Sequence, residues 1–305
     1  MKKYFLVFIA ILCSLSSAFA ETYWAGELPN IKDTSLKAEV IVDKDIFTYS
    51  YSISSGYSNT GQIWSFDIDI RYPEGSIALS DEGLKNGPDD IASTNVLSLP
   101  ETPKMIPVGL WSPPDWNSGL SVVGMAGWGS DDKQYRISPG RYLTGFRIMS
   151  RGLPGIRDFR IEPKLIPPSE EEDEDEENEI AKIQAVEDKA AYHGKTLGPT
   201  APPADFKPLE FIDYIVALKH AASTVTLGWI KNKGVENSLD VKLENAKKAI
   251  ERNNIAAAKN MLSAFINEVE AQGCATYSGC PAGKHLTPEA YGLLKYNAQY
   301  LMERL

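Results

Sequence analysis

The sequence predicts a mixed β and α protein: an N-terminal antiparallel β-sandwich, an acidic, proline-rich linker and a small C-terminal α-helical bundle. Before residue 167, apolar and polar side chains alternate with a period of two in several short runs. After residue 205, apolar side chains recur every three or four residues instead. We therefore divide the chain into a signal peptide (1–20), a β-sandwich domain (21–167), a linker (168–204) and a helical bundle (205–305).

The first twenty residues have the three-part layout of a secretory signal. Lys2 and Lys3 precede an apolar run over 4–15, and Ala18-Phe19-Ala20 follows as a small-residue cleavage site. The run is shorter than the about 20 apolar residues of a transmembrane helix, and no later segment qualifies. We expect cleavage near Ala20 and a secreted or periplasmic protein. Cys13 leaves lipidation as an alternative, although Leu12 stands where that signal needs a small residue.

The strands are predicted from alternation bounded by Gly, Pro, Asn and Asp. Along 63–70, alternation places Trp64, Phe66 and Ile68 inward, with Asp67 and Asp69 toward solvent. The remaining strand candidates cover 36–42, 46–53, 119–128, 142–149 and 158–163. Short strands at this spacing are typical of a β-sandwich.

The linker is predicted from an abrupt change in composition. Eight acidic residues run consecutively over 170–177, and three prolines lie within 199–203. Like charges extend such a run, although a short helix over 180–192 fits the pattern. The formal net charge is -10, so this run leaves the folded parts near neutral. Because no basic patch competes for phosphates, we expect no nucleic-acid partner.

Four amphipathic helices are predicted after the linker. The first begins at Pro208, and the second has Ser238 as its expected N-cap. The third ends at Gly273, and the fourth begins at Thr287-Pro288-Glu289. Short connections between such helices are typical of a small bundle.

Two cysteines remain after removal of the signal peptide. Cys274 and Cys280 are separated by five residues, and an isolated close pair in an oxidising compartment favours a disulfide. Free thiols, a redox pair and a metal site are the alternatives. Redox pairs are usually spaced C-x-x-C, and only His285 lies nearby, so we expect a structural disulfide that closes a short loop.

The C-terminal third resembles the FIMAH module, a small helical unit of exported bacterial proteins. The match covers about residues 207–305 and includes Gly228-Trp229-Ile230, Lys231, Gly234, Ser238-Leu239, Lys242-Leu243, Ala246, Ala257, Leu262, Phe265, Val269, Ala271-Gln272-Gly273, Lys284, Leu286-Thr287 and Ala290. The insertion from Cys274 to Pro281 departs from the module's pattern. The resemblance implies an accessory module without established chemistry.

The N-terminal half has a fainter likeness, used for the fold alone. The motifs are Tyr49 to Ile53, Ile63 to Phe66, Pro139-Gly140, Leu143, Gly145-Phe146 and Leu153-Pro154-Gly155. They are similar to β-sandwich ectodomains of exported proteins that carry a PEP sorting tail. This chain shows no such tail and ends in the predicted helix that finishes at Leu305.

The sequence contains no catalytic or metal-binding signature. His193, His220 and His285 are the three histidines, and none has metal-ligand spacing. The acidic loop after residue 70 (Glu74, Asp81, Glu82, Asp89, Asp90) leaves Ca²⁺ as an alternative, although EF-hand spacing is absent. We expect no cofactor.

The loop around two tryptophans is the candidate ligand site. Trp111 and Trp116 flank Ser-Pro-Pro-Asp, so that Asp115 lies beside a proline-stiffened aromatic pair. Exposed indole rings stack on sugar rings or dock against partner proteins. Alternatively, one or both rings fill the open end of the sandwich.

These patterns favour a non-catalytic exported protein that binds polysaccharide, the cell wall or another surface protein. A secreted carbohydrate-active hydrolase is the first alternative, because two converging carboxylates would suffice; Asp115, Asp131 and Asp132 are candidates. The second alternative is a structural protein that assembles with itself at the surface.

Overall fold

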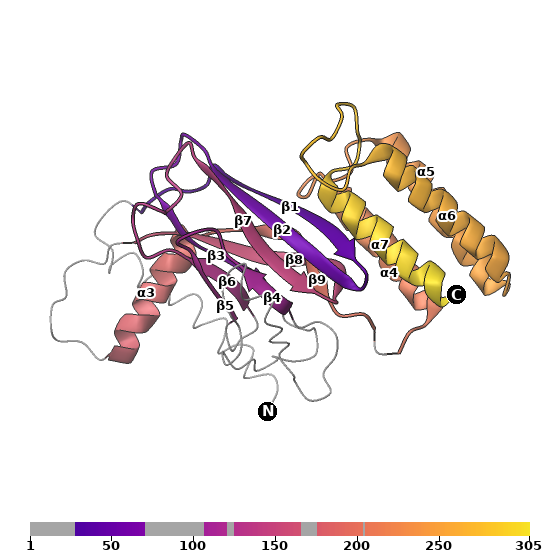
Figure 1. Cartoon of the computed structure of the whole chain (residues 1–305), viewed down its shortest axis with the longest axis horizontal. Helices are drawn as coiled ribbons and strands as arrows, with labels where there is room; N and C mark the ends of the chain where they lie inside the picture. Colours follow the sequence, from indigo (N-terminus) through magenta and orange to yellow (C-terminus); the bar gives the residue numbers. More distant parts are fainter. Residues whose placement is uncertain (1–27, 71–106, 121–124, 166–175, 204) are drawn as a thin grey trace, which may run out of the picture.

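The computed structural model describes residues 28–70, 107–120, 125–165, 176–203 and 205–305. The described residues form two antiparallel β-sheets and five helices, so the mixed β and α fold is confirmed (Figure 1). The predicted signal peptide, the acidic loop after residue 70 and most of the acidic run lie outside the described residues.

The first sheet has four strands in the order β1-β2-β7-β4. Its strands are β1 (Thr34–Asp43), β2 (Ile46–Ser55), β7 (Tyr142–Ser150) and β4 (Pro107–Trp111). In β2, the residues at alternate positions are buried, as the sequence predicted. The turn between β1 and β2 contains Lys44 with a positive φ of 57°.

The second sheet has five strands in the order β5-β6-β3-β8-β9. Its strands are β5 (Asn117–Leu120), β6 (Met125–Gly129), β3 (Ile63–Asp69), β8 (Leu153–Pro163) and β9 (Tyr192–Thr200). The linker prediction was wrong for β9, which pairs with β8 from Leu153↔Thr200 to Ile161↔Tyr192. Leu197 is buried there, so the edge strand contributes to the core.

The two sheets face each other through aromatic side chains. The ring of Phe66 on β3 lies 5.7 Å from the rings of both Tyr51 and Phe146, which belong to the other sheet. Trp128 is 2 % exposed and stacks on Phe66 at 5.1 Å. Such contacts contribute about 0.5–1.5 kcal/mol each beyond the burial of apolar surface.

Trp64 does not join this core, although alternation predicted that it would. The pairing of β3 with β8 shifts register between Ile63 and Ser65, which inserts one extra residue. Because of this bulge, the residues before it point to the opposite face of the sheet from the one that regular alternation predicts. Ile63 is therefore buried, while Trp64 is half-buried with Lys164 Nζ 4.3 Å from its ring centre.

The helices are α3 (Glu176–Ala190), α4 (Pro208–Ala222), α5 (Lys233–Glu251), α6 (Ile255–Gln272) and α7 (Pro288–Arg304). Thr287 caps α7 as predicted, since its Oγ1 accepts a hydrogen bond from the Ala290 N–H at 3.4 Å. The predicted start of α5 at Ser238 was wrong. Asn232 is the N-cap, and the Ser238 hydroxyl instead donates to Glu268 Oε2 at 2.9 Å.

α7 attaches the helices to the sheets. It contacts β1, β8 and β9, and Figure 1 shows α4 and α7 beside the strands with α5 and α6 beyond them. Gly292 permits the close approach, because a Cβ there would lie 2.2 Å from Val40 Cγ1. Asn297 Nδ2 donates to the Pro154 carbonyl at 2.8 Å. The apolar core is therefore continuous from the sheets into the helices.

The predicted disulfide between Cys274 and Cys280 is present, with Cα atoms 5.7 Å apart. Its loop reaches β1: the Tyr277 N–H donates to Glu39 Oε2 at 2.9 Å, and the Tyr277 hydroxyl donates to Glu289 Oε2 at 2.7 Å. Glu289 is buried at 3 % exposure and also accepts a hydrogen bond from the Ala38 N–H. The edge of β1 is thereby covered.

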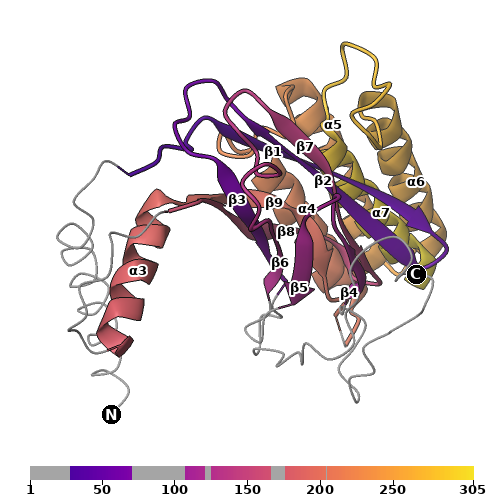
Figure 2. The same cartoon turned by 60° about the vertical axis from the view of Figure 1, so that its left-hand side comes forward.

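The helix α3 lies on the opposite side of the sheets from α4–α7 (Figure 2). Val186 and Ala190 pack against Leu165, just after β8. Among the described helices, none combines the length and apolar character needed to cross a membrane.

Candidate functional site

The two tryptophans of the predicted site have different surroundings. Trp111 ends β4 and is half-buried, with the Arg147 guanidinium 5.1 Å from its ring centre. Trp116 is 4 % exposed, and its Nε1 donates to the Tyr135 carbonyl at 3.0 Å. Trp116 therefore packs in the interior, which was the alternative considered from the sequence, and the pair does not form an exposed platform for stacking.

Asp115 and the acidic residues after β6 are solvent-exposed. Asp115 has a positive φ of 62°, a conformation that aspartate tolerates, and its carbonyl accepts a hydrogen bond from Ser130 Oγ at 2.9 Å. Asp131 and Asp132 lie in the following turn, where Asp132 Oδ1 accepts from the Gln134 N–H. These contacts hold the backbone of the turns in place.

A groove of about 580 Å³ lies on the five-stranded sheet, on the face away from the four-stranded sheet. We call it the β3 groove. Its lining residues are Trp64, Ser65 and Asp67 of β3, Asn117, Ser118, Gly119 and Leu120 of β5, Met125, Gly127, Trp128 and Gly129 of β6, and Glu162 of β8.

Glycines make this groove hollow. Gly119, Gly127 and Gly129 occupy the outward positions of β5 and β6, so no side chain covers the sheet there. Gly127 pairs with Asp67, and a Cβ at Gly127 would lie 2.2 Å from Asp67 Oδ1. A Cβ at Gly119 would meet nothing within 4 Å, which marks the open part of the groove.

Two carboxylates lie in the groove on neighbouring strands. Glu162 is 8 % exposed, accepts a hydrogen bond from Ser65 Oγ at 2.9 Å and forms an ion pair with Arg160, whose Nη2 lies 2.8 Å from Glu162 Oε1. Arg160 also pairs with Asp188 of α3 at 3.0 Å. Asp67 is half-buried, and no described residue donates a hydrogen bond to it.

Burial raises the pKa of Asp67 to about 7, because its charged form loses hydration. The neighbouring charge of Glu162 raises that pKa further, and Arg160 partly opposes both effects. Burial and Glu162 also raise the pKa of Glu187 on α3. The β3 groove therefore contains one fully paired carboxylate and one carboxyl group that changes charge near neutral pH.

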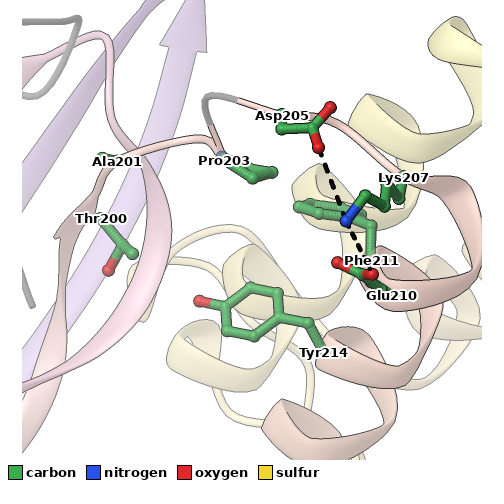
Figure 3. Close-up of a pocket in the computed structure, with 8 residues that line it drawn as sticks. All are labelled: Thr200, Ala201, Pro203, Asp205, Lys207, Glu210, Phe211 and Tyr214. Carbon is green, nitrogen blue, oxygen red and sulfur yellow. Dashed lines mark hydrogen bonds and ion pairs between the residues drawn. The ribbon is translucent and has the colours of Figure 1, made fainter.

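A second, apolar pocket of about 310 Å³ lies between the end of β9 and the start of α4 (Figure 3). Thr200, Ala201 and Pro203 form one wall, and Phe211 and Tyr214 form the other. The ammonium group of Lys207 lies at the rim, 3.1 Å from Glu210 Oε1 and 3.5 Å from Asp205 Oδ2. The walls of this pocket are mainly apolar, and its charged residues lie at the rim.

The histidines are separated in the structure. His193 is exposed on β9, His220 is exposed on α4, and His285 precedes α7. Among the described residues, no three His, Cys, Asp or Glu side chains come together as a metal site would require. The acidic loop considered for Ca²⁺ lies outside those residues.

Sequence reasoning placed Asp67 on the outer face but missed the β3 groove. The available signal was glycine at alternate positions, 127 and 129 in one run and 119 in another. That signal becomes informative only when the strands are paired with β3. In comparisons with known proteins, no family model matches this chain, and no curated protein matches it either.

Proposed function

We propose that the chain is an exported, non-catalytic binding protein whose two sheets form a β-sandwich that holds a polysaccharide in the β3 groove. In this proposal the four C-terminal helices form a FIMAH-like accessory bundle. The observation that carries the proposal is the combination of the half-buried indole of Trp64 with the carboxyl groups of Asp67 and Glu162 in one groove.

The chemistry of the groove suits a sugar chain. The apolar face of a sugar ring packs on an indole ring, and its hydroxyl groups donate to carboxylates. The volume of 580 Å³ falls within the roughly 300–1,000 Å³ of ligand pockets. Because glycines line the floor, a ring can approach the backbone of β5 and β6.

Retention on a panel of insoluble polysaccharides and cell wall tests the proposal. We expect Trp64→Ala and Gly119→Phe to abolish retention, the first by removing the ring and the second by filling open space. Tyr142→Ala is the matched control, because Tyr142 is 74 % exposed and is not among the groove's lining residues. Retention that survives both groove variants but is lost with Tyr142→Ala would place the ligand elsewhere.

A carbohydrate-active hydrolase is the second candidate, favoured by the raised pKa of Asp67 beside Glu162. Most glycosidases use two carboxyl groups, of which one stays protonated near neutral pH as the general acid. Release of new reducing ends from the retained polysaccharide, abolished by Asp67→Asn, would establish hydrolysis. If the polysaccharide retains the protein but no reducing ends are released over a prolonged incubation, the protein binds the polysaccharide without hydrolysing it.

A further inference from the structure

We infer that the β3 groove selects polysaccharides that carry protonated amino groups, such as chains of de-N-acetylated hexosamine. This inference rests on the proposed polysaccharide-binding function and names the ligand class of that same site. It rests on two observations. The charged side chains that line the groove are acidic, and Glu162 has donors for its carboxylate whereas no described residue donates a hydrogen bond to Asp67.

The ionisable side chains that line the groove are both acidic. Asp67 and Glu162 stand among neutral residues, and the lining contains no lysine or arginine. A chain of uronic acids would therefore bring like charges together, which costs free energy in a partly desolvated site.

The cations nearest to the groove are already engaged. Arg160 Nη2 lies 2.8 Å from Glu162 Oε1 and 3.0 Å from Asp188 Oδ1, so its charge is shared between two carboxylates. Lys164 lies over the ring of Trp64, with its Nζ 4.3 Å from the ring centre. On α3, Glu187 adds a further carboxyl group on this side. The surroundings therefore retain an excess of negative charge.

Asp67 is the group that an ammonium would satisfy. It is half-buried, it faces Gly127 across the strand pair, and no described residue donates a hydrogen bond to it. A desolvated carboxylate without a donor is costly, and a charge-assisted bond from an ammonium is the strongest replacement. Hydroxyl groups of a neutral sugar offer the same geometry without the charge. Selectivity for amino sugars should therefore depend on Asp67.

Binding of short oligosaccharides of equal length to the full-length protein at pH 6.8, where a large share of the sugar amines is protonated and Asp67 is partly ionised, tests the inference by isothermal titration calorimetry. The panel comprises β-1,4-linked glucosamine, N-acetylglucosamine, glucose and uronic acid oligomers. We expect the glucosamine oligomer to bind about tenfold more tightly than its N-acetylated form, a gain within the range of one charge-assisted bond. We expect added salt to reduce the preference.

Matched substitutions separate a specific contact from general attraction to an acidic protein. Asp67→Asn and Asp131→Asn change the net charge equally, but Asp131 is an exposed loop residue that is not among the groove's lining residues. We expect the tenfold preference to disappear in Asp67→Asn and to persist in Asp131→Asn. A preference that persists in Asp67→Asn, or equal binding of neutral and amino oligomers, overturns the inference.

The two proposals fail in distinguishable ways. If neutral and amino oligomers bind equally tightly and Gly119→Phe blocks both, the groove binds sugars but the assignment to amino sugars is wrong. If Gly119→Phe changes the binding of none of the oligomers, the groove itself is not the site, and the proposed function fails with it.

Discussion

Asp67 links the charge of the β3 groove to the stability of the protein. Its pKa is about 7 in the folded chain and about 3.8 when unperturbed, so between these values the folded state holds a proton that the unfolded state releases. Stability should therefore fall as pH rises from about 4 to 7, by up to about 4 kcal/mol from this group. Below pH 4 both states are protonated, and the contribution vanishes.

Asp67→Asn removes this ionisation without changing the shape of the side chain. We expect the variant to match the parent protein below pH 4, where both states of Asp67 are protonated, and to exceed its free energy of unfolding at pH 8. Urea unfolding at the two pH values measures the difference. If the free energy of unfolding changes by the same amount between pH 3.5 and pH 8 in the parent protein and in Asp67→Asn, Asp67 ionises normally and the expectation is wrong.

Lys219 is a buried charge within the helices. It is 2 % exposed, and its Nζ lies 2.7 Å from Asp240 Oδ1 and 3.5 Å from Glu236 Oε1. Lys219→Met keeps the apolar stem but leaves Glu236 without its buried partner. We expect a loss of about 2 kcal/mol, reduced from the usual cost of a broken buried pair because Asp240 is half-exposed.

Lys247→Met is the matched control for this substitution. Lys247 pairs with Asp213 between the same two helices, α4 and α5, but their side chains are 35 % and 54 % exposed. Its loss should change the free energy of unfolding much less than the loss of Lys219, because solvent screens an ion pair at the surface. Equal effects of the two substitutions in urea unfolding would mean that burial does not strengthen the Lys219 interaction.

At the scale of residues, the sequence predicts that buried and exposed side chains alternate along a strand, but it does not predict where a bulge interrupts this alternation. Phe66 and Ile68 are buried as expected, whereas Trp64 is half-buried because the register shifts beside it. Asp67 was correctly placed on the outer face. Burial raises its pKa, and the charge of Glu162 raises it further. Glu162 pairs with Ser65 from almost 100 positions away in the chain, and strand pairing of that range is not encoded in local patterns.

At the scale of elements, the disulfide loop connects the start of α7 to the edge of β1. The Tyr277 hydroxyl donates to Glu289, and burial beside that carboxylate raises the pKa of Tyr277. Tyr277→Phe removes this bond and should cost about 1 kcal/mol in the oxidised protein. In the double variant Cys274→Ser with Cys280→Ser, the loop is no longer held, so the same substitution should cost much less.

A double-mutant cycle in urea measures this coupling. If Tyr277→Phe costs the same with and without the disulfide, the loop keeps its position by its own contacts alone. The disulfide was predictable, because it depends on compartment and close spacing. The contact with Glu39 on β1 was not, since it joins residues 238 positions apart in the chain.

The segment 192–200, predicted to belong to the linker, shows why a strand is harder to predict than the burial of a single residue. Tyr192–Thr200 contains two glycines and a proline, which indicate a turn when they are considered alone. In the structure these residues form an edge strand, where proline is tolerated because the outer N–H groups need no partner strand. Tertiary pairing with β8 therefore overrides local composition.

At the scale of the molecule, sheets and helices share one apolar core. Phe47 of β2 and Tyr296 of α7 meet edge to face, with ring centres 5.4 Å apart, and Gly292 lies against Val40. A continuous core of this kind makes unfolding cooperative. If α7 separates from the sheets, the residues of β1 and β9 that pack against it lose their apolar contacts as well. Two separately folded units joined by a flexible spacer would instead unfold in two steps.

Two probes test this cooperativity in a single urea titration. Tryptophan fluorescence follows the sheets through Trp116 and Trp128, although Trp229 also contributes, and circular dichroism at a helical wavelength follows α4–α7. We expect the two transitions to coincide. Gly292→Ala, whose Cβ would overlap Val40, should shift both midpoints to lower urea together by an amount equivalent to about 1–3 kcal/mol. A shift of the helical transition alone would show that the sheets fold without the helices, because the strain at Val40 would then be relieved by undocking α7 rather than by unfolding the sheets.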